Sequence, residues 1–255
     1  VPVPTFSTHG QQYIRKSGIS QAALALLSAS LLVTGCNNFD AQARNAEGVR
    51  MFQQARYHDA LRHFQEANYA DAKNVDAYYN LGATYHRLGV AERNETYLRQ
   101  AENYYEMAVA RNDDHPEAYR GLAVLLADQG RTQEAFTLLE TWARNKPQSA
   151  DAKVELARLC EEFGDRGNAE ARLAEALALD PNSGRAWAAL GRLREQQGDP
   201  AAALRGYERS LSQNRFQPEV AQRIAVLRSR VQPTHSIDAP TGGTRLVEQG
   251  YPVLR

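Results

Sequence analysis

The chain has 255 residues, of which 43% are apolar and 24% are charged, and 30 basic residues balance 30 acidic ones. These are the proportions of an ordinary globular protein, so they argue against a largely disordered chain. A balanced charge provides no basic footprint for a nucleic acid partner. Glycine and proline stand at separate positions and alanine is abundant, which favours closely packed helices over sheet and predicts an all-α fold.

The first 36 residues have the order of an export signal. Arg15 and Lys16 precede an apolar stretch from Ala22 to Val33, which small residues and Cys36 follow. A charged segment, an apolar segment and then small residues are typical of a secretory signal peptide. The stretch is too short and too rich in serine to predict a membrane span. We therefore expect residues 1–36 to be a signal peptide, with a possible extension at its start.

The last five residues of this segment are Leu32-Val33-Thr34-Gly35-Cys36. They resemble the lipobox of bacterial lipoproteins, in which small side chains before the cysteine let the extended chain enter the modifying and cleaving enzymes. The resemblance implies that the thiol of Cys36 receives a diacylglyceryl group and that Cys36 becomes the first residue of the mature protein. Two alternatives stay open, namely an uncleaved anchor and an ordinary signal in which Cys36 is incidental.

The residues that follow Cys36 bear on where the protein is held. The residue directly after Cys36 is Asn37 and not an aspartate. In this it resembles the same position in lipoproteins that are passed on to an outer membrane. It implies a protein lipid-anchored in the cell envelope, on the periplasmic side of the outer membrane if the organism is Gram-negative. We expect residues 37–42 to form a short tether, which at about 3.6 Å per residue keeps the first helix within about 25 Å of the lipid headgroups.

A period of 34 residues runs through the middle of the chain. It appears when Ala60, Ala135, Ala169 and Ala203 are aligned, the last three being 34 residues apart. In the pattern around these alanines, an aromatic residue, then Leu-Gly and then a second aromatic residue come before the alanine. Another aromatic residue and a proline come after it. The positions that carry the pattern are Gly48, Met51, Ala60, Phe64 and Ala67, then Tyr78, Leu81, Gly82, Tyr85, Ala101, Tyr105 and Ala108, then Tyr119, Leu122, Ala123, Gly130, Ala135, Leu139 and Pro147, then Leu156, Ala157, Gly164, Ala169, Leu173, Ala176 and Pro181, and last Trp187, Leu190, Gly191, Gly198, Ala203 and Tyr207.

This pattern resembles that of the tetratricopeptide repeat family. The resemblance implies a superhelix, or α-solenoid, of about five helix-turn-helix repeats over residues 43–231 with a capping helix at its C-terminal end. The expected repeats cover residues 41–74, 75–115, 116–149, 150–183 and 184–217, and the expected cap covers residues 218–231. The first repeat departs most from the pattern, with Arg44 at the aromatic position, as expected of a terminal repeat with one uncovered face.

The second repeat is longer than the others. Tyr85 and Ala101 are 16 residues apart, where the pattern has about nine, so about seven residues are added, or two helical turns. One added turn in each helix would make this hairpin project beyond its neighbours, and an added loop is the alternative. The glycines Gly130, Gly164 and Gly198 are expected in left-handed turns at the ends of first helices.

After the expected cap, residues 232–255 are polar and interrupted by proline and glycine. We expect this tail to be disordered.

No recognisable catalytic or metal-binding motif occurs. The six histidines are scattered, and a His-Glu-x-x-His sequence, a cysteine pair and a phosphate-binding glycine loop are absent. His58 and His63 are five residues apart and are interpreted as surface residues. Asp113-Asp114-His115 is interpreted as a turn between repeats, and Cys160 as a small buried hydrophobe. We therefore expect no enzyme activity, no metal and no cofactor.

The resemblance also implies a peptide-binding groove lined by the first helix of each repeat. The positions that map to it are Phe52, Tyr79, Asn80, His86, Arg87, Arg120, Arg158, Glu161 and Arg192. Arginines in such a lining would pair with carboxylates, and aromatic side chains would supply apolar anchors. A solvated helix face is the alternative, because arginine outnumbers lysine 26 to 4 throughout the chain.

Some relatives have a clamp that binds the C-terminal carboxylate of chaperones, and this clamp needs lysine and asparagine in the groove of the first repeat. Here Asn45 and Val49 occupy those positions, which disfavours this specialisation although Asn80 would suit it.

These features lead to a functional hypothesis. We expect a membrane-anchored scaffold or adaptor that binds an unidentified protein or peptide in the cell envelope, in layout similar to repeat lipoproteins of pilus, secretion or envelope assembly. The alternatives are a structural protein that self-assembles through residues 218–231 and, more remotely, an enzyme with a site built across several hairpins.

Overall fold

A computed structural model describes residues 40–231, and every regular element within that range is an α-helix. The all-α prediction is therefore confirmed. A helix over residues 40–53 comes first. The helices that follow are α2 (Tyr57–Ala70), α3 (Val75–Glu92), α4 (Glu95–Arg111), α5 (Pro116–Asp128), α6 (Thr132–Asn145), α7 (Ala150–Glu162), α8 (Arg166–Leu179), α9 (Gly184–Gln196), α10 (Pro200–Gln213) and α11 (Pro218–Val231).

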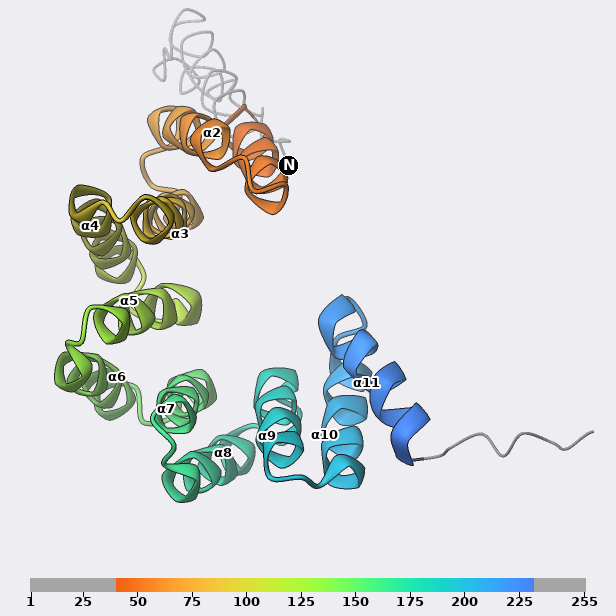
Figure 1. Cartoon of the computed structure of the whole chain (residues 1–255). Helices are drawn as coiled ribbons and strands as arrows, with labels where there is room; N and C mark the ends of the chain where they lie inside the picture. The colour runs from red at the N-terminus through yellow and green to blue at the C-terminus, as the bar shows by residue number, and fades with distance from the viewer. Residues whose placement is uncertain (1–39, 232–255) are drawn as a thin grey trace, which may run out of the picture. The chain divides into compact units, whose positions relative to one another are not determined.

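The chain forms two compact units, Val1–Leu138 and Leu139–Arg255, whose boundary falls within α6. In each unit, helices connected by short turns pack as hairpins, as the ribbon in Figure 1 shows. The first helices of the hairpins are residues 40–53, α3 and α5 in unit 1 and α7, α9 and α11 in unit 2. The second helices are α2 and α4 in unit 1 and α8 and α10 in unit 2.

Side-chain caps and left-handed glycines fix where the helices begin and end. Asn74, Ser149, Asp165, Ser183 and Asp199 each precede a helix and accept a hydrogen bond from the backbone N–H three residues ahead, which satisfies a donor that the helix leaves open. The glycines after α5, α7 and α9 have φ of +77°, +78° and +78°. The predicted left-handed turns at Gly130, Gly164 and Gly198 are confirmed, since glycine adopts this conformation at the lowest cost.

Glycine on a first helix receives an aromatic ring from a second helix. A Cβ at Gly48 would lie 2.5 Å from the Phe64 ring. Tyr105 of α4 lies between Gly82 and Gly121, where a Cβ would come within 2.7 Å and 2.5 Å of its ring. Interior packing leaves no space for those extra atoms. The glycines therefore set how closely the ring-bearing helices approach.

The second hairpin of unit 1 is extended. Helix α3 has 18 residues and α4 has 17, whereas α5 has 13 and α6 has 14. Only Arg93 and Asn94 connect α3 to α4, and Arg93 has φ of 52°. The added residues thus lengthen both helices, and the alternative of a loop is wrong.

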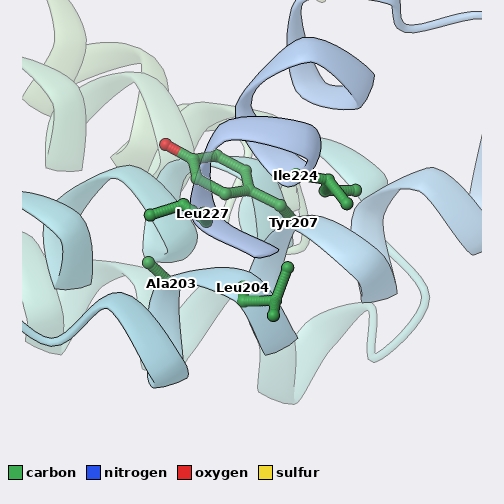
Figure 2. Packing of buried hydrophobic residues seen from close by; sticks show 5 residues of the cluster. All are labelled: Ala203, Leu204, Tyr207, Ile224 and Leu227. Carbon is green, nitrogen blue, oxygen red and sulfur yellow. The ribbon is translucent and has the colours of Figure 1, made fainter. Parts of the chain in front are cut away.

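Helix α11 packs against α10 at the C-terminal end of unit 2, as expected of a cap. Ala203, Leu204 and Tyr207 of α10 form a buried cluster with Ile224 and Leu227 of α11. Figure 2 shows the Tyr207 ring lying across the contact between the two helices. The apolar stripe of α11 is used here, and most of its other residues are exposed.

The structure changes one boundary at the N-terminal side. The expected tether covers residues 37–42, yet residues 40–42 are already helical. Ala41 is fully buried, and Asp40 pairs with Arg44 one turn later at 2.9 Å, so this first turn is held by packing and by a local ion pair. The predicted signal peptide, Cys36 and the tail over residues 232–255 lie outside the described residues. No helix within residues 40–231 combines the length and the apolar character needed to cross a bilayer.

Candidate functional site

The predicted groove residues fall in both units. Unit 1 contains Phe52, Tyr79, Asn80, His86, Arg87 and Arg120, which we call the first-helix face of unit 1. Unit 2 contains Arg158, Glu161 and Arg192.

Two polar contacts bring the first helices of unit 1 together. The side-chain amide of Asn80 on α3 donates to the Oδ1 atom of Asn45 at 2.9 Å. His86, two turns later on α3, has its Nε2 atom 3.2 Å from the Oδ2 atom of Asp128 on α5. Asn80 and His86 therefore connect α3 to the first helix on either side.

A row of aromatic rings runs through the first-helix face of unit 1. The ring centroids of His86 and Tyr105 are 6.3 Å apart, those of Tyr105 and Tyr79 are 6.0 Å apart, and those of Tyr79 and His115 are 5.6 Å apart. Tyr105 is buried, and burial raises the pKa of its hydroxyl far above the usual range. Tyr79 is half-buried, so part of its ring faces solvent on a rigid support.

Phe52 lies further along the same face, on the helix over residues 40–53. It is half-buried and packs against the core cluster of Met51, Phe64 and Leu81. Its ring centroid is 5.2 Å from that of Tyr57, in an edge-to-face arrangement. Phe52 is therefore partly a core residue and partly a surface residue.

His115 stands immediately before α5, and its ring packs against that of Tyr79. Its Nδ1 atom accepts a hydrogen bond from the N–H of Ala118 at 3.2 Å, which makes His115 the N-cap of α5. Its Nε2 atom lies 3.2 Å from the Oδ1 atom of Asp76 on α3. An accepting Nδ1 leaves the proton on Nε2, so Nε2–H donates to Asp76. The predicted turn at this position is confirmed, and its histidine also joins two repeats.

The charge state of His86 depends on its burial. Burial lowers the pKa of His86 below its ordinary value of 6.5, and Arg87 lowers it further, although Asp128 acts in the opposite direction. The imidazole is therefore mostly neutral at pH 7, and its contact with Asp128 is a hydrogen bond from a neutral ring rather than an ion pair.

Arg87 and Arg120 supply the positive charge of the face. Both side chains are exposed, one on α3 and the other on α5. An exposed guanidinium can form two parallel hydrogen bonds to a carboxylate. The unit thus combines a supported, partly exposed tyrosine ring with two exposed arginines.

The arginines of unit 2 have carboxylate partners. Arg192 on α9 donates to both carboxylate oxygens of Glu161 on α7, at 2.8 Å and 2.7 Å. Burial alone would lower the pKa of Arg192, but the hydrogen bonds and charge of Glu161 raise it overall. Arg158 has its Nε atom 3.8 Å from a carboxylate oxygen of Glu155, a buried residue that also receives Arg185 at 2.5 Å. These charges connect α7 to α9.

Most partners in these contacts were not predicted as such from the sequence, namely Asp76, His115, Asp128, Glu155 and Arg185, and Asn45 was considered there only for a carboxylate clamp. One signal was present. Many of the pairs are about one repeat apart, with separations of 35 for Asn45 and Asn80, 34 for His58 and Glu92, and 31 for Glu161 and Arg192. A search for complementary polar residues at about one period would have found several of them.

The other residues that stood out in the sequence have structural environments. Cys160 is 6% exposed, and burial raises the pKa of its thiol, so the prediction of a small buried hydrophobe is confirmed. His58 is exposed and lies 3.0 Å from Glu92 at the end of α3. Within residues 40–231, no three histidine, cysteine, aspartate or glutamate side chains gather as a metal site would require.

Comparisons with known proteins agree with the repeat geometry. Sequence profiles described as tetratricopeptide repeat match residues 91–150 and 161–227, and one described as TPR repeat matches residues 48–89. Tetratricopeptide repeat protein 8 of Homo sapiens is 30% identical over 90 residues, which are 35% of this chain and 15% of that protein. The protein of the same name in Mus musculus is also 30% identical over 90 residues, or 16% of its length. The chain thus matches only a small part of these relatives.

Two solved structures have the same type of fold. A thermophilic tetratricopeptide protein of Thermus thermophilus is 26% identical, with a TM-score of 0.54, and the match covers 73% of this chain and 98% of that one. A tetratricopeptide repeat protein of Parabacteroides merdae is 15% identical, with a TM-score of 0.56 and coverage of 81% and 80%. The second likeness concerns the fold alone.

Proposed function

The chain belongs to the tetratricopeptide repeat family, and from this premise we propose that it is a protein-interaction scaffold that recognises its partner through the first-helix face of unit 1. Proteins of this family typically bind other proteins and do not catalyse reactions. The observation that carries the choice of surface is the row of rings that holds Tyr79 half-exposed between Tyr105 and His115. Aromatic residues on rigid supports, with arginine nearby, are the residues that dominate interface energies.

The two units differ in what they offer to a partner. In unit 1, Arg87 follows His86 of the aromatic row on α3, and its side chain is exposed. In unit 2, the bidentate pair of Arg192 and Glu161 would have to break before Arg192 could bind a ligand. Breaking such a pair leaves a largely buried carboxylate without its partner, which is costly. Unit 1 is therefore the better recognition surface.

The expected ligand follows from these side chains. A peptide segment with an apolar or aromatic side chain would cover Tyr79, and carboxylates on the same segment would pair with Arg87 and Arg120. Such a segment gains affinity from a few buried anchors rather than from total area.

We also propose that the scaffold is held at a membrane of the bacterial cell envelope through a lipid on Cys36. The support is the lipobox-like sequence that ends at Cys36. Only three residues separate Cys36 from the helix that begins the described part, so a lipid there would hold unit 1 close to the headgroups. The mass of the N-terminal peptide of the mature protein tests this proposal. A diacylated Cys36 supports it, and an unmodified thiol on a chain cleaved elsewhere contradicts it.

The recognition surface is tested by affinity capture with the chain as bait. We compare the wild type with a triple variant, Tyr79→Ala, Arg87→Glu and Arg120→Glu, whose expected effect is the loss of at least one captured protein. Arg99→Glu is the matched control, because Arg99 is an exposed arginine on the second helix α4. Equal capture by all three proteins, or equal loss in the control, would count against the first-helix face.

A further inference from the structure

The connection between α10 and α11 displays an aromatic side chain to solvent. Phe216 is 93% exposed. The backbone around it is fixed, because the N–H of Phe216 donates to Asn214 Oδ1 at 2.9 Å and the side-chain amide of Gln217 donates to the carbonyl oxygens of Asn214 and Ser210 at 2.8 Å and 3.1 Å. The fold thus holds Phe216 outward at a pinned turn.

A second turn lies beside this one. The hydroxyl of Ser210 donates to the carbonyl oxygen of Gly184, the first residue of α9, at 2.7 Å, and it also contacts Gln217 at 3.1 Å. Trp187, one turn into α9, is half-exposed and donates from Nε1 to the carbonyl oxygen of Pro181 at 2.8 Å. The connections α8–α9 and α10–α11 therefore form one edge of unit 2, which carries Trp187 and Phe216.

Helices α10 and α11, which meet at this edge, are basic. Residues 200–231 contain six arginines and two glutamates, although the whole chain has no net charge. Arg223 and Arg228 pair with Glu195 and Glu208. Arg205, Arg209 and Arg215 form no ion pair with any residue in the described part of the chain, and Arg209 lies over the Trp187 ring at 5.6 Å. Glu208 is next to Arg209 in the sequence and pairs with Arg228. Glu219, in the first turn of α11, is three residues after Phe216, and Asp180, at the end of α8, is seven residues before Trp187.

From these observations we propose that the edge formed by Trp187, Arg209, Arg215 and Phe216, together with the exposed Arg205 one helical turn before Arg209 on α10, docks on a membrane that contains anionic lipids. The arginines bind the headgroups, and Phe216 enters the interfacial layer between headgroups and acyl chains. This contact is independent of the proposed recognition of a protein partner by unit 1.

The chemistry of the edge favours a lipid surface over a protein. A specific protein interface needs on the order of 1,000 Å² of complementary surface with a packed apolar centre. Here a single phenylalanine stands at a turn, Arg215 precedes it in the chain, and Arg209 lies over Trp187 on the same edge. A lipid interface accepts an isolated aromatic side chain, because Trp and Phe partition into it and arginines beside them attract anionic headgroups.

Vesicle binding tests the proposal on the mature chain, residues 36–255, with Cys36→Ser, which leaves out the expected signal peptide and prevents lipidation. The probes are vesicles of phosphatidylcholine alone and of phosphatidylcholine mixed with phosphatidylglycerol. We expect tighter binding to the anionic vesicles, and we expect added salt to remove that preference. Because each interfacial basic residue contributes about a fivefold change in affinity, Arg205→Glu with Arg215→Glu should weaken anionic binding at least about 25-fold.

Insertion of residue 216 has its own readout. Phe216→Trp should give a blue-shifted emission component with anionic vesicles only, and Phe216→Ser should weaken binding to them. Emission from Trp142 and Trp187 is subtracted with the parent protein.

The chain offers a matched control on another turn of unit 2. The connection α7–α8 carries the same two residue types, Phe163, which is 46% exposed, and Arg166, which is also exposed. Phe163→Ser with Arg166→Glu should leave the preference for anionic vesicles unchanged. Circular dichroism melts of all variants establish that each one is folded.

Three results would overturn the proposal. The first is equal binding to neutral and anionic vesicles by the parent protein. The second is an equal loss in the control and in the edge variant. The third is an edge variant that binds vesicles normally but loses a captured protein, which would assign the edge to a protein partner. None of these results bears on the first-helix face of unit 1, because its variants are tested separately.

Discussion

Gly206 illustrates how single residues set the geometry of the hairpins. A Cβ at Gly206 on α10 would lie 2.8 Å from the Cα of Gly191 on α9 and 3.2 Å from the carbonyl oxygen of Trp187. The obstacle is backbone, which cannot rotate away as a side chain can. The glycine at Gly191 follows from the repeat pattern. The glycine at position 206 does not follow from the pattern. It is required because α9 and α10 cross so closely that no Cβ fits there.

Gly206→Ala should therefore destabilise the protein by about 1–3 kcal/mol, the usual cost of overpacking a core. Gly167→Ala is the control, since the only atom near its Cβ is an Asp165 oxygen at 3.9 Å. Gly167→Ala should stabilise the folded protein by about 0.5 kcal/mol, because alanine has less backbone entropy than glycine in the unfolded chain. Urea unfolding measures both effects, and a Gly206→Ala variant as stable as the wild type would show that the helices can separate freely.

His86 gives a prediction about pH. Its pKa is lowered in the folded state, chiefly by burial and also by Arg87, against the opposing effect of Asp128. The unfolded chain takes up this proton near the ordinary pKa of 6.5, whereas the folded chain takes it up only at lower pH. Protonation of His86 in the unfolded chain therefore lowers the free energy of unfolding as pH falls below about 6.5. Above that pH, His86 causes no such loss of stability.

The comparison is between the wild type and His86→Gln, each unfolded with urea at neutral and at mildly acidic pH. The wild type should lose more stability on acidification than the variant does. Since both proteins carry the other histidines, an equal loss in the two would mean that His86 is not the residue responsible.

At the scale of helices, the ion pairs between neighbouring repeats determine how first helices align. The sequence predicts the helices and the turns because periodic alanine, glycine and proline act locally. It did not predict the pairing of Glu161 with Arg192, because that contact depends on the rotation of α7 and α9 about their own axes. For the same reason, the added residues of the second hairpin could be counted from the sequence, but helix and loop could not be distinguished.

Glu161→Ala removes the carboxylate that holds Arg192. The side chain of Glu161 is 7% exposed, whereas that of Arg192 is 37% exposed and still reaches water. We expect a loss of about 1–2 kcal/mol in the free energy of unfolding, less than the roughly 3–5 kcal/mol for a fully buried pair. Glu162→Ala, at the exposed neighbouring position, should change stability by less than about 0.5 kcal/mol. A thermal or urea melt that ranked the two variants equally would contradict the importance of this pair.

At the scale of the whole molecule, the sequence predicted the family and the repeat count, because those depend on a period that is visible in one chain. The candidate surface was predicted less completely. Tyr79 and His86, seven residues apart, share one side of α3, whereas Asn80 contacts the helix over residues 40–53 on the other side. The support of Tyr79 by His115 and the pairing of Arg158 and Arg192 with carboxylates were not predicted, because they arise where residues of different repeats meet.

The central claim is that the first-helix face of unit 1 holds a protein partner. A photoreactive amino acid in place of Arg87, in cells that produce the full chain, tests this claim most directly. The same amino acid in place of Arg99 on α4 is the control. The account predicts a discrete crosslinked protein from position 87 that Tyr79→Ala weakens and that position 99 does not give. The absence of any adduct at position 87, or the same adducts from both positions, would contradict it.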